Sequence, residues 1–150
     1  MTTVRSESNL SSGPCSDNES NKELVLSVAS RGWHPEMLTK KCSHGYQMHF
    51  GGSTLDLEGL IEFMGAIHYA LPNLVFEIYD VIAEGDKVVT RWNASGTHLG
   101  KFQGVIPTKK PVHFTGITIS RIENGEIVED WEEVDQLNFA QQFGSFSDMF

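Results

Sequence analysis

The stretch PVHFTGITISRIENGEIVEDWEEV, residues 111–134, decides the fold. Two runs of alternating apolar and polar residues flank Asn124-Gly125, and this dipeptide between such runs is the strongest short-range signal of a β-hairpin. A similar hairpin is expected upstream, where residues 75–84 and 87–99 flank Gly85-Asp86 and are rich in β-branched and aromatic residues. The second half of the chain therefore predicts a meander of four antiparallel strands.

The first half of the chain predicts helices and one short strand. Apolar residues recur at helical spacing over residues 56–71. An earlier helix is expected to start near Ser20, with Ser20 as its N-cap and Glu23 as the capping-box partner. Residues 35–41 predict a second short helix, and residues 46–50 a short strand. Helices followed by a meander of strands predict an α+β domain, with the helices on one face of a curved sheet.

The chain of 150 residues has the size of one domain. Residues 1–20 are rich in Ser and Asn and have no apolar period, so we expect a disordered tail followed by one domain over residues 21–150. The C-terminal stretch is too apolar for a free tail and is expected to pack on the domain or on a second subunit of a homodimer. Its apolar residues are Leu137, Phe139, Phe143, Phe146 and Phe150.

The composition excludes several classes of function. The formal net charge is −9 and the longest basic cluster is Lys109-Lys110, which argues against a nucleic-acid partner or an anionic membrane surface. No stretch reaches the roughly 18 apolar residues of a membrane-spanning helix, and no signal peptide is evident, so a cytoplasmic protein is expected. Cys15 and Cys42 lack metal-type spacing, and the six histidines are scattered, so no metal site is expected.

Four pieces of the sequence, in this order and spacing, resemble the SnoaL-like polyketide cyclases of the nuclear transport factor 2-like superfamily. They are FMGAIHYALPNLVFEIYDVIAEGDKVVTRW (63–92), GTHLGKFQGVIPTKKPV (96–112), SRIENGEIVEDWEEVD (120–135) and LNFAQQFG (137–144). The resemblance covers about residues 24–144. It implies a cone-shaped, curved antiparallel sheet wrapped around N-terminal helices. It also implies a cofactor-independent cyclase or isomerase for a largely apolar polyketide or related secondary-metabolite intermediate.

Ring closure by an aldol reaction needs a group that moves a proton next to a carbonyl. Glu132 stands where the cyclase motif has its catalytic aspartate, and Asp135 is the runner-up. Each has a plainer interpretation: Glu132 as one charge of an exposed acidic run, and Asp135 as the N-cap of a C-terminal helix. Strand alternation sends Trp131 and Glu132 to opposite faces, so only one of them can reach a pocket without a bulge.

Two histidines complete the candidate catalytic group. His49 lies where the motif often has a polar residue at the pocket wall, and His98 belongs to its Gly-Thr-His segment; either could instead be a structural histidine. Thr118 replaces a pocket histidine of the motif, which leaves a hydroxyl in place of a proton-transfer group. The expected substrate-binding residues are Thr118 and four aromatic side chains that could also be plain core: Tyr69, Trp92, Phe114 and Trp131.

Two functions stay open on the sequence. One is the cyclase or isomerase, and the other is a binding or accessory module with the same pocket and no turnover. A carboxylate from Glu132 or Asp135 that opens into a cavity beside His49 would favour the enzyme. Epoxide hydrolysis is a minor option, since its Asp-Arg-Asp arrangement has only Arg91 and Arg121 to draw on among the strands.

Overall fold

The computed structural model describes residues 14–143. The helices are α1 (Pro14–Ala29), α2 (Pro35–Lys41), α3 (Leu57–Ala70) and α4 (Gln136–Gln142). The strands are β1 (Cys42–Phe50), β2 (Ser53–Asp56), β3 (Val75–Glu84), β4 (Lys87–Thr97), β5 (Pro111–Glu123) and β6 (Glu126–Val134). Three helices come before the meander of long strands, as the sequence predicts for an α+β domain.

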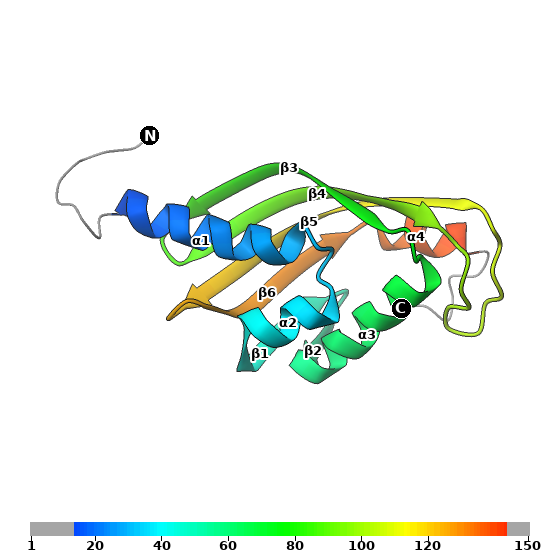
Figure 1. Cartoon of the computed structure of the whole chain (residues 1–150), viewed down its shortest axis with the longest axis horizontal. Coiled ribbons are helices and arrows are strands. Elements are labelled where there is room, and N and C mark those ends of the chain that lie inside the picture. The colour runs from blue at the N-terminus through cyan, green and yellow to red at the C-terminus, as the bar shows by residue number, and fades with distance from the viewer. Residues whose placement is uncertain (1–13, 144–150) are drawn as a thin grey trace.

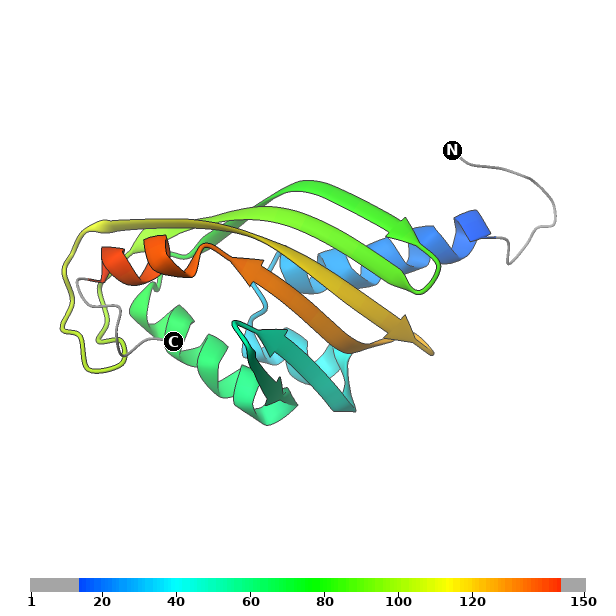
Figure 2. The ribbon, with the colours of Figure 1, turned by 180° about the vertical axis from the view of Figure 1, so that it is seen from behind.

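All six strands form one curved sheet in the order β2-β1-β6-β5-β4-β3. Figures 1 and 2 show α1, α2 and α3 on one side of it, which gives the expected cone shape. The neighbours β3 to β6 are antiparallel, whereas β1 pairs with β6 in parallel. The sheet is therefore mixed. β1 and β6 lie far apart in the chain and no hairpin joins them, so their pairing need not be antiparallel.

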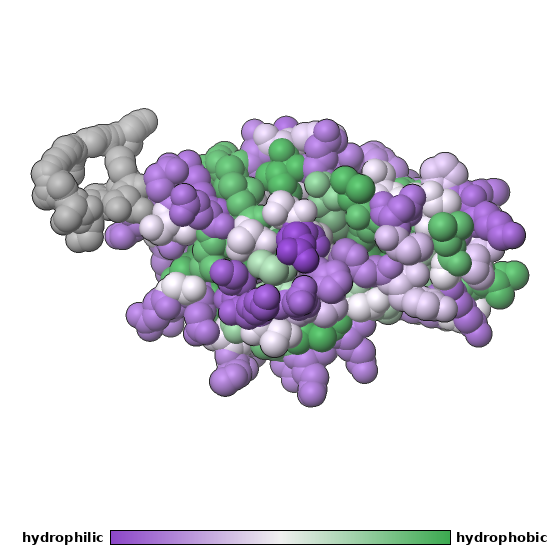
Figure 3. All heavy atoms as spheres, viewed as in Figure 1, coloured by the Kyte–Doolittle hydropathy of each residue, from purple (hydrophilic) through white to green (hydrophobic). Residues whose placement is uncertain are grey.

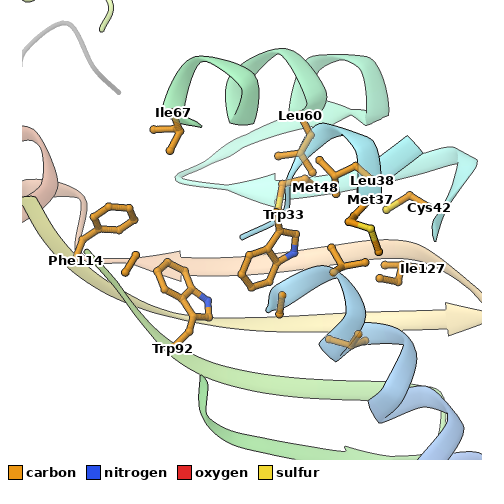
Figure 4. Packing of buried hydrophobic residues seen from close by; sticks show 14 of the residues in the cluster. Trp33, Met37, Leu38, Cys42, Met48, Leu60, Ile67, Trp92, Phe114 and Ile127 are labelled. Atoms are coloured by element: carbon orange, nitrogen blue, oxygen red, sulfur yellow. The ribbon is translucent and has the colours of Figure 1, made fainter. Parts of the chain in front are cut away.

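The inner face of the sheet carries the core. Along β5, alternate side chains are buried, as a half-buried strand requires. The helices add Val28, Leu38 and Leu60, all nearly or fully buried. Figure 4 shows buried side chains from the helices and from β1, β4, β5 and β6 meeting in this interior. The inward residues of β5 are Val112, Phe114, Gly116, Thr118, Ser120 and Ile122.

The turn after α1 holds two residues in the left-handed region. Gly32 has φ +65°, and a Cβ added there would lie 2.7 Å from Cδ1 of Phe76. Trp33 has φ 51°, an unfavourable conformation for a bulky residue. Its indole packs against Phe76, at 5.4 Å between ring centroids, and against Trp92, at 5.9 Å. This aromatic packing offsets the strain and fixes Trp33 against the sheet.

Three local predictions need correction. The first helix begins at Pro14, so Ser20 and Glu23 lie inside it and do not form a cap. Residues 14–20 are thus helical, and residues 1–13 lie outside the described part of the chain. The strand β2 was not predicted, because a four-residue edge strand has too little pattern of its own. The predicted strand over residues 46–50 begins earlier, at Cys42.

The C-terminal stretch is only partly buried where the structure describes it. Phe139 and Phe143 pack into the core, while Leu137 is exposed. Phe146 and Phe150 lie outside the described residues. Among residues 14–143, no helix combines the length and apolar character needed to cross a bilayer.

The surface seen in Figure 3 mixes hydrophilic and hydrophobic side chains. Hydrophobic side chains reach the surface in the upper part of this view, where the edge strand β3 lies in Figure 1. The exposed hydrophobic residues of β3 are Val75, Tyr79 and Ile82.

Candidate active site

A narrow cavity lies between α3, β1, β2 and the inner face of the main sheet. Its volume is about 40 Å³. Among the described residues that line it, Glu132 is the single ionisable one, and all the others are hydrophobic. Figure 4 shows several of these side chains directed into the interior. The lining residues are Trp33, Met48, Phe50, Leu55, Leu60, Phe63, Met64, Ile67, Phe76, Trp92, Phe114, Glu132, Val134 and Phe139.

A β-bulge turns Glu132 toward this cavity. Ile122 of β5 pairs with Ile127 of β6, but the preceding Arg121 pairs with Glu129, so Val128 is an extra residue on β6. Simple alternation from the buried Ile127 would send Glu129, Trp131 and Glu133 inward. The extra residue reverses the phase, and the inward residues after it are Asp130, Glu132 and Val134.

A short chain of hydrogen bonds holds the Glu132 carboxyl group. Nε1 of Trp92 donates to Oγ1 of Thr118 at 3.0 Å, and the Thr118 hydroxyl donates to Oε1 of Glu132 at 3.3 Å. Gly116 makes room for this indole, since a Cβ there would lie 2.8 Å from Cη2 of Trp92. Thr118 thus orients Glu132, and both of these hydrogen bonds use its one hydroxyl group.

The surroundings of Glu132 keep it protonated near neutral pH. Burial raises the pKa of Glu132 to about 8; the charge of Asp130 adds to the rise, and the hydrogen bond from Thr118 opposes it. At pH 7 a group with this pKa is ionised in about one molecule in ten. A protonated carboxyl group in an apolar site donates a hydrogen bond to an oxygen of a bound molecule. The site can therefore deliver a proton to a carbonyl oxygen.

His49 lies on the other face of the sheet, so the expectation that it shares a pocket with Glu132 is wrong. Alternation along β1 turns Met48 and Phe50 inward and His49 outward. Its Nε2 lies 2.6 Å from Oε2 of Glu129. Its ring stacks on Trp131, with 5.5 Å between the centroids. Trp131 is therefore not a pocket wall either.

His98 is buried at the end of β4 but does not line the cavity. The backbone N–H of Thr108 donates to Nδ1 of His98 at 3.2 Å, which places the ring proton of the neutral form on Nε2. Burial lowers the pKa of His98. Its ring forms a T-shaped contact with the ring of Phe143, with 4.7 Å between the centroids. His98 therefore holds the loop between β4 and β5 through its hydrogen bond with Thr108, as expected of a structural histidine.

The structure separates the remaining candidates. Asp135 is exposed and caps α4, because its carboxylate accepts from the backbone N–H of Asn138 at 3.1 Å. Tyr69 is 67% exposed on α3 and takes no part in the cavity. Trp92 and Phe114 line the cavity, and their role in substrate binding stays a prediction. Glu132, Thr118, Trp92 and Phe114 thus come together, and the other five candidates lie elsewhere.

Sequence reasoning missed a second buried carboxyl group. Asp130 is fully buried two residues before Glu132, where the sequence shows only an acidic run. The run is in fact split between faces, because Glu129 and Glu133 point outward while Asp130 points inward. Among residues 14–143, no group of three or more His, Cys, Asp and Glu side chains is arranged to hold a metal ion.

Comparison with known proteins places this geometry in context. Residues 30–143 match the family model described as SnoaL-like polyketide cyclase. Among curated proteins, none matches the chain at a significant level. AclR from Streptomyces galilaeus, a proposed hydroxylase, is 24% identical with a TM-score of 0.76, over 85% of this chain and 97% of that one. IdmH from Streptomyces antibioticus, a proposed polyketide cyclase, is 26% identical with a TM-score of 0.67, over 85% and 98%.

Proposed function

Because this chain belongs to the SnoaL-like polyketide cyclase family, we propose that it is a cofactor-independent cyclase or isomerase with Glu132 as the proton-transferring group. Its substrate is a polyketide or a related secondary-metabolite intermediate. One observation supports the role of Glu132: among the described residues that line the cavity, it has the single ionisable side chain, and the rest are hydrophobic. A pKa of about 8 suits a proton donor at neutral pH.

An aldol closure follows from this arrangement. Protonated Glu132 donates to the oxygen of the carbonyl group that is attacked. The enol carbon of the same molecule forms the new carbon–carbon bond, the carbonyl π electrons move to oxygen, and that oxygen takes the proton of Glu132. The enol hydroxyl proton then returns to the Glu132 carboxylate. Such general acid catalysis contributes roughly 10²- to 10⁴-fold to a rate.

The lining also restricts the substrate. A molecule that fits here presents a carbonyl oxygen to Glu132 and hydrocarbon to the rest of the cavity. The volume of about 40 Å³ is far below the roughly 300–1,000 Å³ of most small-molecule pockets. Substrate entry therefore requires lining side chains to move. The half-buried Phe63 and Met64 of α3 are suited to this, and an unbranched methionine readily changes rotamer.

The test uses synthetic 1,5-diketones of increasing alkyl length, whose intramolecular aldol closure gives a β-hydroxy ketone; loss of water from this product then gives a cyclohexenone with a strong ultraviolet absorbance. The wild-type protein should accelerate closure, and Glu132→Gln should not. The rate should fall as the pH rises through about 8, since the donor is the protonated form. Diketones that bind equally to both proteins without closure by either would favour the alternative, a small-molecule-binding or accessory module.

A further inference from the structure

Asp130 is the inward neighbour of Glu132 on β6. Two residues along a strand separate their Cα atoms by roughly 7 Å. Asp130 is fully buried, and its Oδ2 accepts a hydrogen bond from the hydroxyl group of Tyr46 on β1. Ser120 is its cross-strand partner on β5, as Thr118 is the partner of Glu132. The two carboxyl groups therefore lie side by side on one inner wall, each beside a hydroxyl residue of β5.

We propose that Asp130 is a positioning residue for Glu132: it holds a buried negative charge that keeps the proton of the pair on the carboxyl group facing the cavity. The inference rests on the proposed role of Glu132 as proton donor. Asp130 itself does not line the cavity, so it acts through Glu132 and does not touch the substrate.

The hydrogen bonds decide which of the two groups ionises first. Burial raises the pKa of Asp130 to about 6, and the hydrogen bond from Tyr46 holds it below that of Glu132. Glu132 receives one weaker hydrogen bond and has a pKa of about 8. Between these values, Asp130 is charged and Glu132 is protonated. Because the groups interact, the pair titrates in two linked steps.

Among residues 14–143, no positively charged side chain forms an ion pair with either carboxyl group. Burial raises the pKa of Tyr46 well above its usual value and also raises that of the Cys42 thiol, so both stay neutral. The hydroxyl residues of β5 are neutral. The residues that the helices contribute to the core are hydrophobic, among them Val25, Val28, Leu38, Leu60 and Ile67.

A purely structural role is the competing explanation, since the Tyr46–Asp130 hydrogen bond also ties β1 to β6. The two explanations differ in what happens to Glu132. A structural link affects stability alone, whereas a charge that governs the proton of Glu132 also sets its titration midpoint. The titration can be followed without any substrate, by ¹³C NMR of the glutamate side-chain carboxyl groups, with the Glu132 signal assigned from its absence in Glu132→Gln.

In Asp130→Asn, which keeps the shape of the side chain, the Glu132 midpoint should fall by about one pH unit because the neighbouring negative charge is gone. The matched control is Glu133→Gln, which removes a charge next to Glu132 on the outer face and should leave the midpoint in place. An unchanged Glu132 midpoint in folded Asp130→Asn would overturn the proposal.

Tyr46→Phe covers the case in which Asp130→Asn does not fold. Loss of the Tyr46 donor destabilises ionised Asp130, so the titration midpoint of the lower step should move up toward that of the upper step. An unchanged spacing between the two midpoints would overturn the proposal.

Measurements of activity then separate this proposal from the proposed function. With an active protein, the falling limb of the pH–rate profile of Asp130→Asn shifts to lower pH with the Glu132 midpoint. The same NMR shift in a protein without turnover would leave the coupling standing and overturn the proposed function.

Discussion

Glu132 and Trp131 are consecutive residues of β6 whose side chains lie on opposite faces of the sheet. The carboxyl group of Glu132 faces the apolar cavity, while the Trp131 ring stacks on His49 outside. The extra residue Val128 sets this choice, because it reverses the phase that the buried Ile127 begins. The same strand thus places Glu132 in an apolar interior and leaves Trp131 in a surface cluster with His49 and Glu129.

Glu132→Gln should lower the turnover rate of a diketone that the wild-type protein accepts by roughly 10²- to 10⁴-fold. The amide is nearly isosteric, so circular dichroism spectra should be unchanged. His49→Ala is the control on the outer face. It should keep most of the activity, and it should lower the free energy of unfolding because the contacts with Glu129 and Trp131 are lost. A variant Glu132→Gln with full activity would contradict the assignment.

Because of Glu132, the wild-type protein should lose stability relative to Glu132→Gln as the pH rises from about 5 to about 8. The folded-state pKa of Glu132, about 8, is above its ordinary value of 4.5, so the folded protein binds more protons than the unfolded chain in this window. The stabilising contribution is complete below the ordinary value and is lost as the pH passes through 8. Glu132→Gln lacks this contribution. In urea unfolding, the free energy of unfolding of the variant should therefore rise relative to that of the wild type between about pH 5 and pH 8. A relative rise for the wild type over this range would refute the prediction.

Thr118→Val should raise the pKa of Glu132 further, because the hydrogen bond from Thr118 favours the ionised form. It also leaves the buried Nε1–H of Trp92 without its acceptor, at a cost of about 1–3 kcal/mol of unfolding free energy. Thr90→Val is the matched control, since Thr90 is the cross-strand neighbour of Thr118 and its buried hydroxyl has no partner among the described residues. NMR titration and urea unfolding measure both effects; equal effects of the two variants would be the contrary result.

Gly116→Ala should displace the indole of Trp92, because the new methyl group would lie 2.8 Å from Cη2 and 3.0 Å from the carbonyl oxygen of Glu133. We expect a loss of about 1–3 kcal/mol of unfolding free energy. The intrinsic fluorescence should change as well. Thermal unfolding measures the loss of stability. Gly45→Ala, where a Cβ meets nothing within 4 Å, should leave the melting temperature nearly unchanged. Equal melting temperatures for both variants would show that Trp92 can move aside.

We expect the protein to form a homodimer. On the outer face of the sheet, Tyr79 is 47% exposed and Ile117 is 44% exposed, and a second copy would cover them. Light scattering coupled to size-exclusion chromatography measures the mass directly. Monomer alone at tens of micromolar protein would count against this assembly.

The strands and most helices could be predicted because their signals are local. Asn124-Gly125, Gly85-Asp86 and the alternation around them define the two hairpins, and β3 and β6 have the predicted bounds. The unpredicted features depend on distant parts of the chain. The edge strand β2 pairs with β1, and β1 pairs in parallel with β6, from which β2, α3 and β3 to β5 separate it in the chain.

For the site, the sequence by itself determined that an acidic residue would stand at position 132 on a closing strand, with a hydroxyl at 118 and aromatic residues at 92 and 114. Only the tertiary structure decided which residues face the cavity. Alternation fixes the period of a strand but not its phase against the core. One extra residue, Val128, turned Glu132 and Asp130 inward and left Trp131 outside, and the pairing of β1 with β6 then placed His49 beside Trp131.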